Sequence, residues 1–401
     1  MFSCFCAGEE PLSRRLSVTA RNVATTCAQY YHSDDEGQER HPDNGQQQQQ
    51  QQLCELLHQI WGSIPDPVDR NRAAERRIFP NAVVRQSHPL VVVRDDNDMK
   101  QHSTAADTVV LATHLGVPKL DILRVQATWW GGPVSATLYI KNEEDIAVFL
   151  DFLQNHNNEL QYVSFHIVLE KTTNLPYPHN ILRNMAIEYL DAHFFVAVDV
   201  DFIPNLNAFE GLNAMLHEPR SKLRSELTNH RLFLLPAFER IAHKNSETVT
   251  EDLLPQSKAE LKDMFKKKKL IGFHMSGSPL GHGPTNFPLW LQNKTDVFYE
   301  IEYKNVFEPY VMGYRPGIPR YWEDFRGYGY NKFSWYMELH KACYQFAVLR
   351  DFYVVHMNHP MVSRDTKHDQ TEDNRDYWKQ FKFYMSGRYK QTCKFSPLKT
   401  E

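Results

Sequence analysis

FFVAVDVDFIPN, residues 194–205, is a short apolar run bounded by a proline, and it predicts a buried β-strand. Asp199 and Asp201 stand two residues apart near its end, so an extended backbone would direct both carboxylates to one face. Ionised carboxylates beside an apolar core require a cationic partner. Hard oxygen ligands of this kind suit Mg²⁺ or Mn²⁺, and such an ion usually carries phosphate. The stretch therefore predicts a metal–nucleotide site at a strand end, with a pair of helix caps before a turn as the alternative.

Strand-like and helix-like segments alternate on the N-terminal side of this stretch. The predicted strands are 108–113, 136–140 and 163–169, and the predicted helices are 120–129, 143–154 and 180–192. This alternation predicts an α/β fold with a Rossmann-like, mostly parallel sheet. Ligands of such sheets bind outside the carboxyl ends of the strands, where Asp199 and Asp201 fall.

The C-terminal half is less regular and rich in aromatic residues. Its predicted elements are strands at 232–237 and 352–356, a helix at 255–267, and a glycine-spaced loop at 326–332 that opens a helix through 337–339. Loop-rich halves set on such sheets commonly hold the second substrate. We therefore expect one domain over residues 90–395, with a nucleotide-binding half at about 105–205 and an acceptor half at about 206–391.

Composition excludes several classes of protein. The 401 residues carry a net charge of −4, which provides no basic field for nucleic acid or for an anionic membrane. We see no apolar window long enough to span a bilayer and no signal peptide. Residues 1–80 are polar and contain the glutamine tract Gln46–Gln52, which predicts disorder. Only Cys343 and Cys393 lie outside the irregular first part, so we expect no disulfide framework.

A series of short motifs follows in order along the chain. They are YPHNILRN at 177–184, DVD at 199–201, LPAFE at 235–239, SKAEL at 257–261, GPTNF at 283–287, FEPY at 307–310, GYGYNK at 327–332, MEL at 337–339 and VHM at 355–357. Together they resemble glycosyltransferase family 49, the catalytic domain shared by the LARGE-type glucuronyltransferases and the β-1,4-glucuronyltransferase of O-mannose glycan synthesis. The resemblance covers roughly residues 105–391.

The resemblance implies a GT-A fold that uses a UDP-sugar and Mn²⁺, or Mg²⁺. Characterised enzymes of the family transfer glucuronic acid with inversion onto xylose-type acceptors, as part of protein glycosylation. The resemblance implies that Asp201 binds the metal directly and that Asp199 does so directly or through water, reaching the ribose. It also implies that His356, at the end of a predicted strand, is the third protein ligand. A histidine of the core or of a loop is the alternative for His356.

Five residues are candidates for binding the donor. Thr113 and His114 end the first predicted strand, where GT-A enzymes hold uracil. Arg183 and Asn184 lie near a predicted helix start, and an arginine suits bidentate pairing with a diphosphate or a nucleotide edge. The charge of Lys332 could meet a donor phosphate or carboxylate. The alternatives are a structural threonine, an exposed histidine, a surface arginine and a solvated lysine.

Inverting transfer needs a base that takes the proton of the acceptor hydroxyl. Many GT-A enzymes keep an acidic residue in the helix after a glycine-rich loop, and Glu338 is the candidate there. A structural carboxylate is the alternative for Glu338, and Glu308 and Asp324 are further candidates. Trp322 stands where we expect an acidic residue, which weakens the case for Asp324.

Two other functions compete with a glycosyltransferase acting on a glycan or glycoprotein acceptor. One is a non-catalytic protein on the same fold that binds a glycan or a nucleotide. The other is a haloacid-dehalogenase-like phosphatase, whose apolar strand also ends in Asp-x-Asp. The resemblance implies the Golgi lumen, although we find no anchor in the chain. The donor sugar, the acceptor, the linkage and the oligomeric state remain open.

Overall fold

The computed structural model describes the backbone of residues 90–93 and then residues 105–156, 159–169, 175–190, 192–241, 251–292, 294, 296–357, 364–390 and 393. The segment 1–80, which we predict to be disordered, lies outside these residues. The strands are β1 Leu90–Val93, β2 Val109–Gly116, β3 Val134–Ile140, β4 Val163–Leu169, β5 Phe194–Ala197, β6 Phe202–Pro204, β7 Arg231–Leu235, β8 Ala237–Arg240, β9 Leu270–Gly272, β10 Phe298–Ile301, β11 Tyr310–Tyr314, β12 Gln345–Leu349 and β13 Val354–His356.

The helices surround the strands in both halves of the described chain. They are α4 Leu120–Trp130, α5 Glu143–His156, α6 His179–Glu188, α7 Ala208–His217, α8 Lys222–Thr228, α9 Lys258–Lys266, α10 Pro279–His282, α11 Phe287–Trp290, α12 Phe333–Lys341 and α13 Arg364–Arg388. Short 3₁₀ turns are η4 Ala105–Asp107, η5 Val117–Lys119, η6 Glu251–Leu253 and η7 Gly283–Thr285. Among the residues with described structure, no helix has the length and apolarity to cross a membrane.

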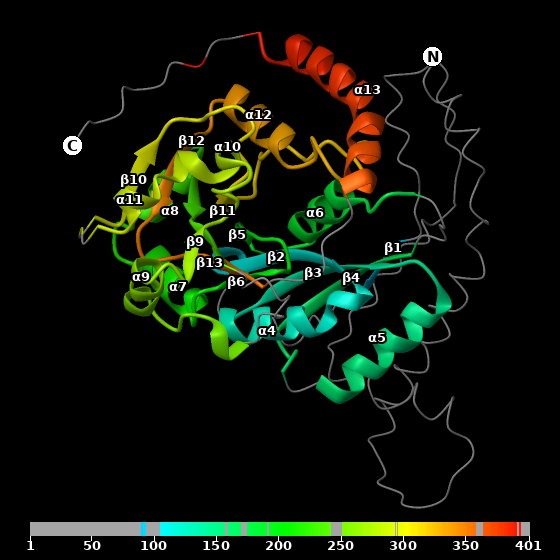
Figure 1. Ribbon diagram of the computed structural model, residues 1–401, viewed down its shortest axis with the longest axis horizontal. Coiled ribbons are helices and arrows are strands. Elements are labelled where there is room, and N and C mark those ends of the chain that lie inside the picture. The colour runs from blue at the N-terminus through cyan, green and yellow to red at the C-terminus, as the bar shows by residue number, and fades with distance from the viewer. Residues whose placement is uncertain are drawn as a thin grey trace, which may run out of the picture.

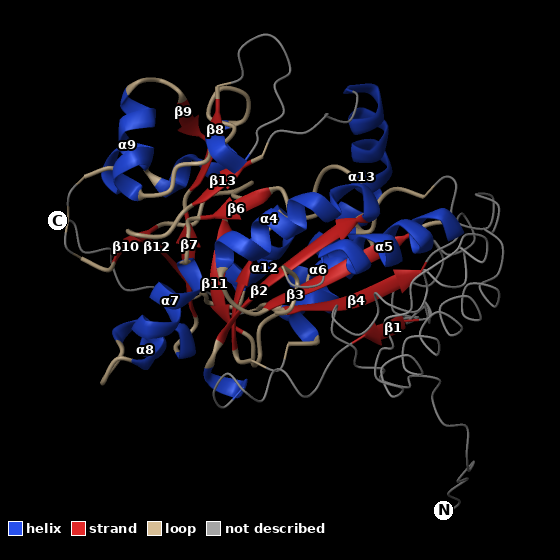
Figure 2. Cartoon of the chain, turned by 90° about the horizontal axis from the view of Figure 1, so that it is seen from below, coloured by secondary structure: helices blue, strands red, loops and turns tan. Residues whose placement is uncertain are grey.

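Within the described chain the larger sheet has nine strands, in the order β1-β4-β3-β2-β5-β11-β7-β12-β10. The neighbours β4, β3, β2 and β5 run parallel, and β7 and β12 share their direction. Only β1, β10 and β11 of this described sheet run the opposite way. The mostly parallel sheet confirms the predicted α/β fold of the GT-A type. A smaller sheet in the order β6-β13-β8-β9 lies beside it (Figure 2).

Helices cover both faces of the larger sheet, as Figure 1 shows for α4 and α5 on one side and α6 and α12 on the other. Because successive strand residues point to opposite faces, β2 contributes to two apolar cores. Val109 and Leu111 belong to the core that includes residues of α4 and α5. Val110 and Ala112 belong to the core that includes residues of α6 and α12. This double burial explains why the strand sequences are almost continuously apolar.

The strand predicted at 194–205 is two strands separated by a turn. β5 ends at Ala197, the N–H of Phe202 donates to the carbonyl of Asp199 at 3.0 Å, and β6 begins at Phe202 in the smaller sheet. The expectation that both carboxylates share one face of an extended strand is therefore wrong. The chain turns between Asp199 and Asp201 to pass from one sheet to the other, so their side chains meet different partners.

Strand β11 lies between β5 and β7 and runs antiparallel to both. The predicted strands do not include this segment. Its register pairs Val311 with Ala197, which places Tyr310 beside the turn that carries Asp199. The strand thus brings a residue of the FEPY motif to the end of β5.

Helix α13 packs on the segment that precedes α12. Phe381 and Met385 form a buried cluster with Phe325. A disulfide joins Cys343 to Cys393, with 5.4 Å between their Cα atoms. The sequence, which implies no framework of several disulfides, did not predict this single bridge.

Candidate active site

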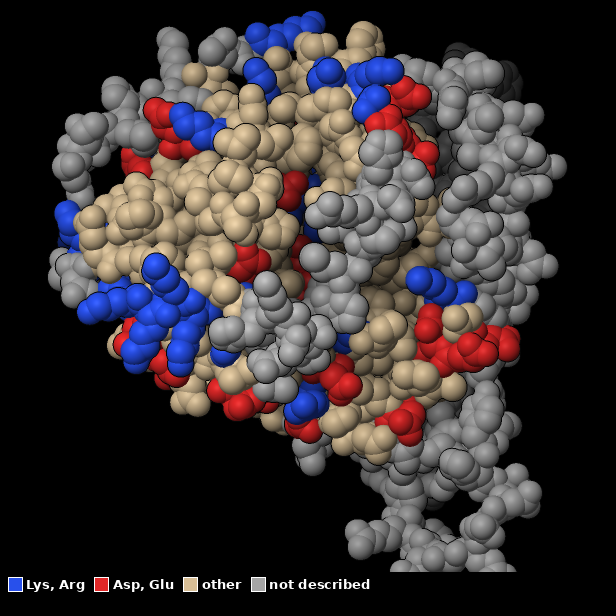
Figure 3. All heavy atoms as spheres, viewed as in Figure 1, with Lys and Arg blue, Asp and Glu red and all other residues tan. Residues whose placement is uncertain are grey.

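A pocket lies at the carboxyl ends of β2 and β5, neighbouring strands of the larger sheet. It holds about 300 Å³ of space, part of it open to solvent. Figure 3 shows a hollow near the middle of one face of the molecule, with acidic and basic atoms inside it. The residues that line the pocket are Ala112, Thr113, His114, Arg183, Ala186, Ile187, Ala197, Val198, Asp199, Pro309, Tyr310, Tyr321, Lys332 and Tyr336.

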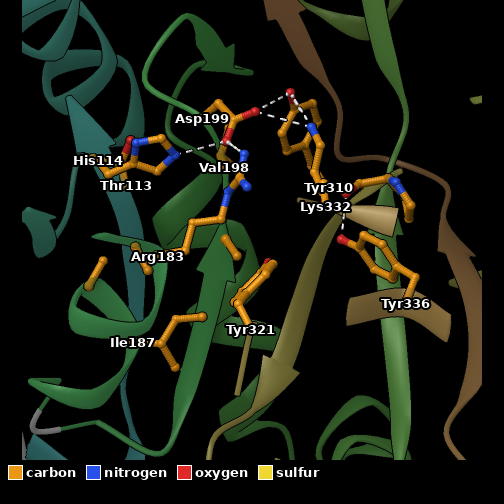
Figure 4. Close-up of a pocket in the computed structure, with 14 residues that line it drawn as sticks. Thr113, His114, Arg183, Ile187, Val198, Asp199, Tyr310, Tyr321, Lys332 and Tyr336 are labelled. Carbon is orange, nitrogen blue, oxygen red and sulfur yellow. Dashed lines mark hydrogen bonds and ion pairs between the residues drawn. The ribbon is translucent and has the colours of Figure 1, made fainter. Parts of the chain in front are cut away.

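The carboxylate of Asp199 is the centre of the pocket, and side chains from four other segments converge on it (Figure 4). Its Oδ1 accepts from Arg183 Nη2 at 2.9 Å and lies 3.3 Å from His114 Nε2. Its Oδ2 accepts from the Tyr310 hydroxyl at 2.9 Å and from Lys332 Nζ at 3.1 Å. Burial by itself would raise the pKa of Asp199, but Arg183, Lys332 and His114 hold that pKa well below its usual range. Asp199 is therefore an ionised carboxylate whose two oxygens are engaged by these donors.

Arg183 is buried and held from two sides, unlike the surface arginine considered as its alternative. It lies on α6, and its Nη1 donates to Asn180 Oδ1 at 3.0 Å and to Asn331 Oδ1 at 3.1 Å. Its guanidinium also lies 5.6 Å from the centre of the Tyr321 ring. These contacts orient the guanidinium before any anion arrives.

Lys332 is likewise buried, which contradicts the alternative of a solvated helix lysine. Its Nζ donates to Asp199 and, at 3.0 Å, to the Tyr310 hydroxyl, and it lies 4.1 Å from the centre of the Tyr310 ring. Two buried cations thus face one carboxylate at the pocket wall. Such an arrangement carries a surplus of positive charge that suits a diphosphate.

Asp201 has a different set of neighbours. Its Oδ2 accepts from Lys119 Nζ at 3.1 Å and lies 3.6 Å from His356 Nε2. Strand β13 pairs with β6 so that His356 stands opposite Phe202, which explains how a histidine so distant in sequence reaches Asp201. Asp201 and His356 are therefore neighbours in the fold, as two ligands of one metal ion would be.

No group of three or more His, Cys, Asp or Glu side chains is placed to hold a metal ion within the described ranges. The physical reason is that Asp199 is turned toward the cations and the tyrosine of the pocket. The predicted ligand set therefore comes together only in part, as Asp201 and His356. Two ligands of one Mn²⁺ or Mg²⁺ lie about 3 Å apart, since each is about 2.1 Å from the ion. A separation of 3.6 Å between Asp201 Oδ2 and His356 Nε2 fits such an ion after a small adjustment.

Thr113 lines the pocket from β2, and its buried Oγ1 has no hydrogen-bond partner among the described residues. Buried hydroxyls are normally satisfied, so this one is available to a ligand. Asn184 is different, because it is absent from the pocket lining. Its amide donates to the Tyr321 carbonyl and to Glu323 Oε1, both at 2.9 Å, and accepts from the Tyr321 N–H at 2.8 Å. The prediction that Asn184 binds the donor is therefore not supported, because its hydrogen bonds hold the segment 321–323.

Glu338 also lies away from the pocket. It is buried on α12, where Oε1 accepts from the Tyr389 hydroxyl at 2.9 Å and lies 3.5 Å from the Tyr384 hydroxyl. Its geometry is that of a structural carboxylate at the junction with α13, the alternative considered for it. Glu308 directly precedes two residues of the pocket lining, Pro309 and Tyr310, and is half-buried.

Sequence reasoning did not identify several residues of the site. Tyr310, Tyr321 and Tyr336 form an aromatic wall. The sequence suggests Tyr336 as one of several aromatic residues that could stack on a sugar, but it assigns no role to Tyr321, and Tyr310 appears only within the motif FEPY. Gln126 of α4 is fully buried and donates to the carbonyls of Asp199 and Phe202 at 3.1 and 2.8 Å. A lone glutamine in an amphipathic helix carries no signal of this role.

Comparison with known proteins identifies the family to which this chain is similar. The model of glycosyltransferase family 49, described as a glycosyl-transferase for dystroglycan, matches residues 169–390. The xylosyl- and glucuronyltransferase LARGE1 of Mus musculus is 32% identical over 288 residues, which is 70% of this chain and 36% of that protein. LARGE1 of Homo sapiens is 32% identical over 303 residues, which is 72% of this chain and 37% of that protein. The chain thus spans little more than a third of the length of these relatives.

The solved structures are more distant. The structure of GalNAc-T7 with UDP, GalNAc and Mn²⁺ gives a TM-score of 0.36 at 9% identity, over 69% of this chain and 50% of that one. A likeness at this level supports no argument about the site.

Proposed function

Because the chain belongs to glycosyltransferase family 49, the family of the glycosyl-transferase for dystroglycan, we propose that it transfers glucuronic acid from UDP-glucuronic acid to a xylose-type acceptor, with a divalent metal and with inversion. The main support for the proposal is the pair of buried cations, Arg183 and Lys332, which both form ion pairs with Asp199. Asp201, two residues further along the chain, lies beside His356. The choice of glucuronic acid rests on the similarity to the xylosyl- and glucuronyltransferases.

The residues of the pocket have separate roles in this proposal. Arg183 and Lys332 bind the diphosphate, and the unpartnered Thr113 hydroxyl hydrogen-bonds to the nucleoside. Asp199 holds the two cations in place, so little reorganisation is needed when the donor binds. Asp201 and His356 would hold a divalent ion, which when bound would supply Lewis-acid stabilisation of the charge that develops on the leaving diphosphate.

Glu308 replaces Glu338 as the general base in this proposal. It is half-buried, and its backbone N–H donates to the Gly281 carbonyl at 2.8 Å, which anchors it beside the pocket wall. Burial raises the pKa of Glu308, while Lys332 and Arg183 oppose that shift. Glu308 takes the proton of the acceptor hydroxyl while the oxygen bonds to the anomeric carbon, and the electrons of the broken carbon–oxygen bond leave with UDP.

Substituting the proposed base should slow the chemical step without weakening donor binding. We expect Glu308→Gln to lower kcat about 100-fold, a typical loss for a missing general base, with the Kd of UDP within about twofold of the wild type. Glu338→Gln is the matched control, because its amide oxygen can still accept from Tyr389, and its kcat should stay near that of the wild type. Steady-state kinetics and calorimetry measure both values. A fully active Glu308→Gln protein would exclude this base.

The proposed donor and metal are tested with a panel of UDP-sugars, with Mn²⁺ or with a chelator. We expect transfer or slow hydrolysis of UDP-glucuronic acid to exceed that of UDP-glucose, UDP-galactose and UDP-N-acetylglucosamine at least about tenfold, and chelator to abolish it. Full turnover in chelator contradicts the metal role. No turnover with any donor and no UDP binding would instead support the non-catalytic alternative.

The compartment of the protein is proposed from its disulfide. A bridge between Cys343 and Cys393 favours an oxidising environment, because cytosolic thiols are kept reduced. This agrees with the lumen of the Golgi, where the acceptor would be a glycan on a glycoprotein.

A further inference from the structure

The side chain of Asn374 connects helix α13 to the glycine-rich turn 326–331. Asn374 is 2% exposed, and its Nδ2 lies 2.8 Å from the carbonyl of Arg326 and 3.1 Å from the carbonyls of Tyr328 and Gly329. Its Oδ1 accepts from the N–H of Arg326 at 3.3 Å. One turn earlier on α13, Gln370 Oε1 accepts from the Tyr328 N–H at 2.8 Å. One amide side chain therefore satisfies backbone groups of three residues in this turn.

The turn needs such support because its backbone is unusual. Gly327, Gly329 and Tyr330 have φ angles of 65°, 86° and 60°, in the left-handed region that side chains disfavour. A Cβ atom on Gly327 would lie 2.5 Å from Gln370 Oε1, so the close approach of α13 also requires glycine there. A turn of this kind keeps its shape only when its surroundings determine it.

The same turn delivers two residues to the candidate site. Asn331 closes it, with its Nδ2 donating to the Gly327 carbonyl at 2.8 Å, and its Oδ1 accepts from Arg183. Lys332 is the next residue and pairs with Asp199. The shape of the turn thus places Lys332 and one of the hydrogen-bond acceptors of Arg183.

Helix α13 is anchored independently of Asn374. The ring of Trp378 lies 5.2 Å from those of Tyr330 and Phe333, and the ring of Phe381 lies 5.5 Å from that of Trp322. The Cys343–Cys393 disulfide secures the chain beyond the end of the helix. Asn374 therefore lies on a helix that other contacts hold in place, and it hydrogen-bonds to a turn whose backbone conformation is unfavourable on its own.

We propose that Asn374 is a positioning residue of the donor site, which acts through the turn 326–331 to place Lys332 and Asn331 for binding the diphosphate of a UDP-sugar. The inference rests on the proposed function, because the ligand is the donor named there. It adds α13, a helix with no residue in the pocket lining, to the parts of the chain that determine donor affinity.

The test compares two substitutions on α13 in the full chain, with UDP and Mn²⁺ as the probe. We expect Asn374→Ala to raise the Kd of UDP about tenfold, as for the loss of one well-placed charged contact. Asn374→Asp should do the same, because a carboxylate cannot donate to the three carbonyls. Phe381→Leu is the matched control: it loosens the packing of the same helix and lowers Tm, but should leave the Kd within about twofold of the wild type.

A double-mutant cycle separates positioning from general destabilisation. If Asn374 acts through Lys332, the effects of Asn374→Ala and Lys332→Met on the Kd of UDP are strongly non-additive, and the double variant binds about as weakly as Lys332→Met. Additive effects, or an unchanged Kd in a folded Asn374→Ala protein, would overturn the inference while leaving the proposed function intact. Failure of the wild type to bind UDP would overturn the proposed function and this inference with it.

Discussion

Asp199→Asn should be less stable than the wild type by about 3–5 kcal/mol, the cost of breaking a buried ion pair from one side. The reason is that Arg183 and Lys332 would both remain buried with only a neutral amide between them. The amide would also direct an N–H group toward donors that now point at a carboxylate oxygen. In thermal unfolding we expect Tm to fall by roughly 10 °C, together with loss of UDP binding.

Asp201→Asn is the matched control for this prediction. Its carboxylate pairs with Lys119, whose side chain is one-third exposed, so removing that charge should cost only about 1 kcal/mol or less. The two substitutions in one Asp-x-Asp motif should therefore differ by several degrees in Tm. Equal stability of the two variants would contradict the structural role assigned to Asp199.

Asp201→Asn should test the catalytic role of the motif more directly than Asp199→Asn, because the Asp201→Asn protein stays folded. We expect turnover of the donor to fall roughly 10³-fold, which corresponds to losing ~4 kcal/mol of charge stabilisation in the transition state. Binding of Mn²⁺ in the presence of UDP should weaken in parallel, and electron paramagnetic resonance of free Mn²⁺ measures this without reference to activity. His356→Ala should weaken Mn²⁺ binding in the same way, since its Nε2 lies beside the same oxygen.

The control for this second prediction is Asp121→Asn. Asp121 is an exposed carboxylate in the first turn of α4, and its loss should change neither turnover nor Mn²⁺ binding. Wild-type turnover by a folded Asp201→Asn protein would exclude a metal role for this residue.

Much of the fold could be predicted from local patterns. Apolar runs such as 163–169 and amphipathic stretches such as 143–154 match β4 and α5 closely, because a residue's preference for strand or helix depends mainly on its near neighbours. The C-terminal half was harder to predict. β11 lies within the sheet but is only five residues long, which is too short for a clear alternation of apolar and polar residues. α13 is strongly polar, so its sequence shows no clear apolar face.

The sequence predicted which residues belong to the candidate site better than it predicted what each of them does. Four of the five predicted donor residues line the pocket, since a strand end, a helix start and a glycine-spaced loop can be recognised in the sequence. Asn184 and Glu338 were wrongly expected to face a ligand, because sequence position along a helix does not reveal which neighbouring loop or helix will supply their hydrogen bonds.

By itself the sequence determined an α/β chain with a pair of carboxylates at a strand end, and its ordered motifs indicated the family. Only the tertiary structure decided what each carboxylate does. The turn closed between Asp199 and Phe202 separates the two side chains. Arg183 and Lys332 then come to Asp199, and His356 comes to Asp201, from elements up to 155 residues away along the chain. Such pairings follow from long-range packing of strands and helices, which local sequence does not encode.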